Sequence, residues 1–105
     1  MAGYSIWVTA VGEEVLLVGE KPESAYTLEL MTMLGKGAPR VVVRAVGRNI
    51  SKAVYVTEGV RRLTGDKIAY GKIRIYSTEV GEVKEEKSVP VIEIEVVNLG
   101  VERRA

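Results

Sequence analysis

A group of basic and small residues around one predicted turn is the strongest candidate for chemistry in this sequence. Its members, in chain order, are Arg44, Gly47, Arg48, Asn49 and Lys52. The first turn of a helix presents N–H groups that have no partner inside the helix, and a glycine lets a ligand approach the backbone closely. With basic side chains on both sides, such a turn predicts an anion site suited to phosphate. Basic residues also occur near helix starts for solubility alone.

Residue types that commonly carry catalysis or bind metal ions are scarce. The sequence has no His and no Cys, which removes the commonest general base, the commonest metal ligand and every thiolate or disulfide. No serine therefore has a histidine partner. The sequence predicts a protein that is not an enzyme, with no catalytic residue, no metal site and no cofactor.

Two glutamates, Glu93 and Glu95, share one face of a predicted strand, as a pair of catalytic carboxylates would. Lys72 and Arg74 alternate in the same way on the preceding strand. Opposite charges on neighbouring strands commonly form ion pairs. We therefore interpret the two glutamates as cross-strand partners of these two bases.

Charge is segregated along the chain, although the formal net charge is only +1. Residues 36–74 contain ten Lys or Arg and two acids, a net charge of +8, whereas the remainder has a net charge of −7. A basic middle segment is a candidate surface for a polyanion. The alternative is that these bases pair with the flanking acids and the folded surface is mixed.

The hydrophobic pattern predicts elements in the order β-α-β-α-β-β. Short apolar or alternating runs indicate strands, and apolar residues three or four apart indicate helices. The expected strands are 15–18, 40–46, 72–76 and 89–97, and the expected helices are 22–34 and 50–63. Two crossovers and a final antiparallel hairpin then give an α+β, two-layer α/β sandwich, in which both helices pack on one face of a four-stranded mixed sheet.

The second predicted helix is the one that borders the candidate turn. Asn49 is expected to be its N-cap, because asparagine is favoured at that position. The stripe that the helix is expected to bury comprises Ile50, Ala53, Val54, Thr57 and Val60.

The length is typical of one domain, and we expect residues 1–105 to form one, with residues 1–12 as an N-terminal extension and 77–88 as a hairpin arm. No apolar run approaches the roughly 18 residues of a membrane span, and no secretory leader is recognisable. These features predict a cytoplasmic protein without membrane association. The sequence lacks Cys and Gln and is rich in Glu, Lys and Arg, which favours a thermophile origin.

Two segments resemble the Alba family of archaeal nucleic-acid-binding proteins. The first is Gly19-Glu20-Lys21-Pro22 followed by a helix, and the second is the run VRAVGRNISKAV at residues 43–54. The resemblance extends over about residues 13–97. It implies the fold of the C-terminal domain of bacterial translation initiation factor three, a dimer, and binding of duplex DNA and often RNA.

The resemblance also implies which residues contact nucleic acid. The implied contacts are Lys21, Arg44, Gly47, Arg48, Asn49, Lys52, and, on the hairpin arm, Lys84 and Lys87. Glu20 and Val46 stand where the family has basic residues, and the arm also carries Glu79, Glu82, Glu85 and Glu86. Leu63 and Thr64 occupy the region of the aromatic that the family uses between dimers. We therefore expect weaker duplex binding than is typical of the family.

Together with the resemblance, these residues imply a dimer, associated with the chromosome, that binds double-stranded DNA largely independently of sequence. Two alternatives remain. In the first, the protein is an RNA-binding subunit of a ribonucleoprotein. In the second, it is a subunit that forms a heterodimer with a more basic paralogue.

Overall fold

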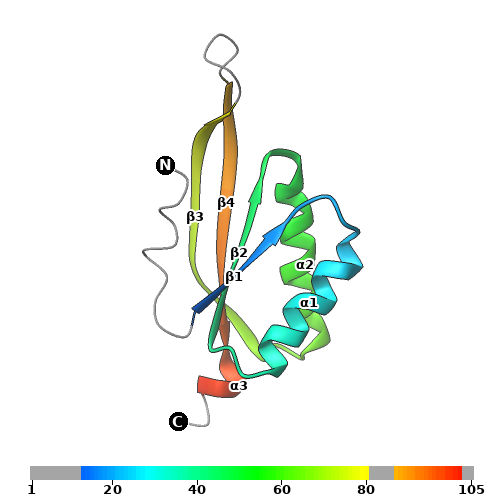
Figure 1. Ribbon diagram of the computed structural model, residues 1–105. Helices are drawn as coiled ribbons and strands as arrows, with labels where there is room; N and C mark the ends of the chain where they lie inside the picture. Colours follow the sequence, from blue (N-terminus) through cyan, green and yellow to red (C-terminus); the bar gives the residue numbers. More distant parts are fainter. Residues whose placement is uncertain (1–12, 81–86, 103–105) are drawn as a thin grey trace.

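The predicted order of elements is confirmed by the computed structural model, which describes residues 13–80 and 87–102 (Figure 1). The elements are β1 (Glu13–Val18), α1 (Glu23–Gly35), β2 (Arg40–Val46), a 3-10 turn η2 (Gly47–Asn49), α2 (Ile50–Leu63), β3 (Ile68–Val80), β4 (Lys87–Asn98) and a terminal turn of helix α3 (Leu99–Glu102). The N-terminal extension 1–12 lies outside the described residues.

The four strands form one mixed sheet in the order β1-β2-β4-β3. β1 is parallel to β2, whereas β4 is antiparallel to both β2 and β3. The last strand in the sequence therefore inserts between β2 and β3. The mixed four-stranded sheet of the sequence prediction is confirmed.

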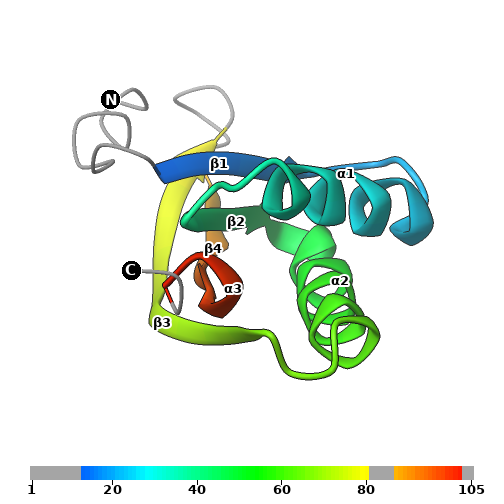
Figure 2. The ribbon, with the colours of Figure 1, turned by 90° about the horizontal axis from the view of Figure 1, so that it is seen from below.

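Helices α1 and α2 lie side by side on one face of the sheet, as predicted (Figures 1 and 2). Strand β2 alternates strictly, and its buried side chains, Val41, Val43 and Ala45, point to the helices. Burying a valine side chain contributes about 1.5–3 kcal/mol, so the valine-rich strands supply much of the core. The fully buried core side chains include Leu30, Val41, Val43, Val56, Val60 and Val96.

Helix α2 has the predicted bounds, but the prediction of its buried face was partly wrong. Ala53, Thr57 and Val60 are buried as expected, whereas Val54 is 43% exposed and Val56 is fully buried. Positions 53, 56, 57 and 60 follow the three-and-four spacing of one helical face. Val54 lies one residue, or about 100°, away from this face.

The hairpin of β3 and β4 is longer than the predicted strands. β3 begins at Ile68, and a register shift between Tyr70 and Ile73 interrupts its pairing with β4. Gly71 lies in this bulge, where an added Cβ would clash with the Glu95 carboxylate. Pairing continues to Val80 and Lys87, so the strands extend into the segment that was predicted to be an arm.

Candidate nucleic-acid interface

The turn between β1 and α1 is fastened to the start of α2. The hydroxyl of buried Tyr26 accepts hydrogen bonds from the backbone N–H groups of Gly19 and Lys21, at 2.9 and 3.2 Å. The ammonium group of Lys52 donates to the carbonyl oxygens of the same two residues, each at 2.7 Å. Tyr26 on α1 and Lys52 on α2 therefore fix the backbone of this turn on both sides of Glu20.

Glu20 is the partner of the two polar side chains that precede α2. Arg48 Nη2 donates to Glu20 Oε1 at 2.9 Å, and Asn49 Nδ2 donates to Glu20 Oε2 at 3.1 Å. The side chains of Arg48 and Glu20 are 82% and 66% exposed. The hydrogen bond from Asn49, and then that from Arg48, lower the pKa of Glu20 below its usual value.

Asn49 occupies the predicted N-cap position of α2, but its side chain does not cap the helix. The side chain makes no capping hydrogen bond, and the backbone angles of Asn49 are helical, with φ −85° and ψ −3°. An N-capping side chain normally bonds an N–H of the first turn from an extended backbone. Here the preceding residues already form a 3-10 turn, and the Asn49 amide is directed to Glu20.

Gly47 is required by the shape of the turn. Its φ is +59°, a conformation that costs little only for glycine, and an added Cβ would lie 3.3 Å from a methyl carbon of Val89 on β4. The fold of the turn therefore requires a glycine here, whether or not a ligand also approaches the turn.

Lys21 completes the cluster. Its ammonium lies 5.5 Å from the centre of the Tyr26 ring, and that of Lys52 lies 5.8 Å from the same centre, within range of cation–π attraction. The structure thus brings together five of the predicted site residues: Lys21, Gly47, Arg48, Asn49 and Lys52. We call these residues the α2-start cluster.

Arg44 does not join the α2-start cluster. It lies on the sheet face opposite the helices, because the neighbouring Val43 and Ala45 point into the core. There its Nε is 3.2 Å from Glu93 Oε2, and its Nη2 donates to the Tyr76 hydroxyl at 3.3 Å. Of the other two predicted contacts, Lys84 lies outside the described residues and Lys87 is the first residue of β4.

The interpretation of Glu93 as a cross-strand partner is confirmed. Besides Arg44, its carboxylate pairs with Arg74 at 3.2 Å and accepts a hydrogen bond from the Tyr76 hydroxyl at 2.8 Å. Glu95 forms an ion pair with Arg40, and its carboxylate accepts a hydrogen bond from the backbone N–H of Lys72 at 3.0 Å. The two glutamates therefore serve as partners of basic residues and backbone groups rather than as a pair of catalytic carboxylates.

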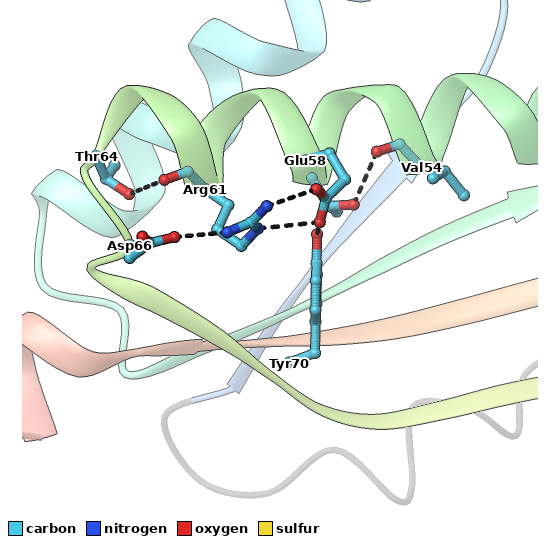
Figure 3. Close-up of polar contacts among 7 residues, drawn as sticks. Val54, Glu58, Arg61, Thr64, Asp66 and Tyr70 are labelled. Atoms are coloured by element: carbon cyan, nitrogen blue, oxygen red, sulfur yellow. Dashed lines mark hydrogen bonds and ion pairs between the residues drawn. The ribbon is translucent and has the colours of Figure 1, made fainter.

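Sequence reasoning missed a second polar cluster, which joins the C-terminal half of α2 to β3 (Figure 3). The Arg61 guanidinium donates to both oxygens of Glu58, at 3.1 and 2.9 Å, and to Asp66 at 2.6 Å. The Tyr70 hydroxyl also bonds Glu58. Hydrogen bonds from Arg61 and then Tyr70 lower the pKa of Glu58 to about 2, and burial is the main cause that raises the pKa of Tyr70. The i,i+3 spacing of Glu58 and Arg61 was the available signal.

This cluster predicts a specific acid sensitivity. The pKa of Glu58 is about 2 in the folded protein and near 4.5 in an ordinary carboxyl, so its stabilising effect is complete above pH 4.5 and is lost as the pH falls towards 2. We expect Glu58→Gln to lower the melting temperature by a few degrees at pH 7 and by progressively less between pH 4.5 and 2. Circular-dichroism melts at several pH values measure this difference.

The matched control for that series is Glu29→Gln, which removes an exposed carboxylate from α1. Its effect on the melting temperature is expected to be small at every pH. A difference between wild type and Glu58→Gln that stays constant from pH 7 to pH 2 would contradict the role of the ionised carboxylate.

Within residues 13–80 and 87–102, no three His, Cys, Asp or Glu side chains gather in a way that could hold a metal ion. In the same part of the chain, every helix is too short or too polar to cross a membrane.

Comparison with known proteins gives a consistent result. The Alba family model matches residues 14–77. A protein of Nanoarchaeum equitans named DNA/RNA-binding protein Alba is 38% identical over 85 residues, which cover 78% of this chain and 94% of that protein. A Methanocella arvoryzae protein of the same name is 37% identical over 83 residues, covering 78% and 86%.

The fold is also similar to a solved structure, that of Alba from Thermoplasma volcanium. The TM-score is 0.75 at 30% sequence identity, and the match covers 80% of this chain and 99% of the other. The names of these relatives describe binding of DNA and RNA and describe no enzymatic activity.

Proposed function

The chain belongs to the Alba family, whose model matches more than half of its length, and we propose that it binds double-stranded DNA through phosphate contacts. The observation that carries this proposal is the α2-start cluster, in which Lys21, Arg48 and Asn49 surround a helix N-terminus. Two curated relatives are named as DNA/RNA-binding proteins, which supports the same class of ligand.

The side chains of the α2-start cluster suit the DNA backbone better than the bases. Exposed Lys and Arg side chains attract phosphate and release its counterions, which makes affinity fall steeply with salt. Backbone contacts position a protein without reading sequence. Binding is therefore largely independent of sequence, as expected for a protein that packages a chromosome.

Lys52 has a different part in this interface. Two of the three ammonium hydrogens are used by the carbonyls of Gly19 and Lys21. Lys52 thus mainly positions the β1–α1 turn and leaves one donor for a phosphate. Lys21 and Arg48 are exposed and are therefore the side chains most accessible to a phosphate.

We further propose that the protein binds as a dimer. By register, Ile73 and Ile75 lie on the core face of the sheet, opposite Ile94 and Ile92. Ile94 is buried, yet Ile73 and Ile75 are 51% and 75% exposed. Strand β3 is the edge strand of the sheet, next to β4, and the two helices lie towards the other edge (Figure 2). The core face of β3 is therefore left largely without a helical cover. A second copy that packs there would bury these isoleucines.

A heterodimer with a more basic paralogue is the second candidate assembly. The favouring observation is that this chain's own carboxylates, Glu20 and Glu93, pair with Arg48 and Arg44. A basic partner would supply additional phosphate contacts. RNA remains an alternative ligand, since the relatives are named for both nucleic acids.

Arg48→Ala tests the phosphate contact directly. The loss of one contact is expected to weaken duplex binding by roughly threefold to tenfold near 0.1 M salt and to reduce the salt slope by about one. The effect should be the same on duplexes of different sequence. Fluorescence anisotropy over a salt series measures both quantities.

The control is Arg62→Ala, which removes an exposed arginine from the opposite end of α2. Its affinity is expected to stay within about twofold of wild type. A loss of affinity for Arg48→Ala with an unchanged salt slope would show that Arg48 is structural rather than a phosphate ligand.

The same titration with two duplexes and one structured RNA tests the proposed function as a whole. A steep salt slope with equal affinity for both duplexes supports it. A clear preference for RNA would show that RNA, rather than duplex DNA, is the ligand. Absence of binding to all three at low salt would overturn binding by this chain alone and lead to a search for a partner chain.

A further inference from the structure

The Glu20 carboxylate uses two donors that the α2-start cluster could otherwise offer to a phosphate. Its two oxygens take one donor each, Oε1 from Arg48 and Oε2 from Asn49. A phosphate offers the same kind of anionic oxygens to the same donors. The chain therefore satisfies part of its own anion site with an internal carboxylate.

The backbone on both sides of Glu20 is held in place. Gly19 and Lys21, on either side of it, are each bonded to both Tyr26 and Lys52. The turn can therefore stay fixed while the Glu20 side chain rotates. That side chain is 66% exposed, so rotation into solvent is sterically open.

We propose that Glu20 is an internal competitor for phosphate, which lowers the affinity of the α2-start cluster until an incoming nucleic acid displaces it. This inference rests on the proposed function, because it concerns the same site. Binding exchanges two hydrogen bonds to Glu20 for two to phosphate. The displaced carboxylate stays nearby and repels the ligand. Both effects lower the affinity for nucleic acid, whereas the surrounding basic side chains raise it.

The ionisation state of Glu20 supports this competition. Asn49 and Arg48 favour the charged carboxylate and lower its pKa, so Glu20 is negative throughout the neutral range. The groups that face it are Arg48 and Lys52 on the α2 side and Asn49 between them. The competitor therefore acts continuously at neutral pH.

Competition also selects among ligands. A duplex that makes several phosphate contacts elsewhere on the protein gains enough from them to displace Glu20. An isolated phosphate group has only the α2-start cluster to bind, and each exchange of acceptors there yields little net free energy. We therefore expect the chain to discriminate strongly between extended nucleic acid and single nucleotides.

The test compares Glu20→Ala with Glu23→Ala, which removes an equal and exposed charge three residues further on, at the start of α1. General charge repulsion affects both variants, whereas only Glu20 contacts Arg48 and Asn49. Glu20→Ala is expected to bind a duplex roughly threefold to tenfold more tightly than Glu23→Ala near 0.1 M salt. Anisotropy measures the affinities, and circular dichroism checks that both variants fold.

A double-variant cycle shows whether the gain passes through the proposed contacts. In a chain that also carries Arg48→Ala and Asn49→Ala, Glu20→Ala should tighten binding no more than Glu23→Ala does. Equal affinity of the two single variants, or an undiminished advantage of Glu20→Ala in that background, would overturn the competition.

The proposed function and the competition fail in different ways. Binding by wild type with no difference between Glu20→Ala and Glu23→Ala overturns the competition alone. Absence of duplex binding by wild type and both variants overturns the proposed function, and the competition with it. A direct readout is the pair of side-chain NMR signals of Asn49, which should shift on addition of duplex to wild type and move in the free protein on Glu20→Ala.

Discussion

Replacing Glu93 by alanine is expected to lower the free energy of unfolding by about 2–3 kcal/mol. The Glu93 side chain is 9% exposed and accepts contacts from Arg44, Arg74 and the Tyr76 hydroxyl. Its removal leaves the Arg44 guanidinium, which is only 23% exposed, without this counter-charge. A partly buried charge that loses its partner is costly. The figure is below that for a deeply buried pair because Arg74 is 56% exposed.

Urea unfolding followed by circular dichroism gives this free energy. Glu93→Gln keeps the shape of the side chain and one carbonyl oxygen with two lone pairs, but it loses the charge. Its free energy of unfolding should therefore lie between those of wild type and Glu93→Ala. Glu29→Ala, on the exposed face of α1, should lie within about 0.5 kcal/mol of wild type. If Glu93→Ala lowers the free energy of unfolding by less than about 1 kcal/mol, the contacts of Glu93 with Arg44 and Arg74 are no stronger than ordinary surface ion pairs.

The sequence predicted one side of this network and missed the other. The two-residue period of β3 and β4 gave the pairing of Arg74 with Glu93, because a hairpin joins these strands directly. Arg44 reaches the same carboxylate only because β4 inserts beside β2. That neighbour relation joins residues 49 positions apart, and no local pattern contains it.

The difference between local and long-range contacts also explains which parts of the candidate site could be predicted from the sequence. The basic residues before and within α2 are close together in the sequence, and they were identified from it. The contacts of Glu20 with Arg48 and Asn49 span 28 and 29 residues. They depend on the turn that Tyr26 and Lys52 hold together. A hydrophobic pattern counts Tyr26 as an apolar residue and gives no signal for its hydroxyl. A buried tyrosine hydroxyl usually finds a partner, and this rule was the available clue.

Bounds were predicted best where a local signal marks them. Helix α2 ends at Leu63, and after Thr64 come Gly65 and Asp66, whose φ angles are +65° and +63°. Glycine marks such an end in the sequence. The start of β3 at Ile68 had no such mark, because the bulge at Gly71 interrupts the alternation on which strand prediction relies.

Replacing Ile75 by glutamate is expected to convert the proposed dimer into a monomer. Ile75 is 75% exposed in the single chain and lies on the apolar face of β3 that we assign to the second copy. Burial of an unpaired carboxylate in an interface is strongly unfavourable. Sedimentation velocity should therefore show a loss of the dimer at micromolar concentrations, with an unchanged circular-dichroism spectrum.

Duplex binding should weaken in parallel, because a monomer presents one α2-start cluster where the dimer presents two. Loss of several phosphate contacts lowers affinity by at least about tenfold near 0.1 M salt and reduces the salt slope accordingly. Leu17→Glu is the matched control, since Leu17 is a strand residue that is 62% exposed on the opposite face of the sheet. It introduces the same charge and should leave the dimer intact. A dimer that survives Ile75→Glu but dissociates with Leu17→Glu would move the contact to the face that carries Arg44 and Glu93, where those residues would be buried between the two copies.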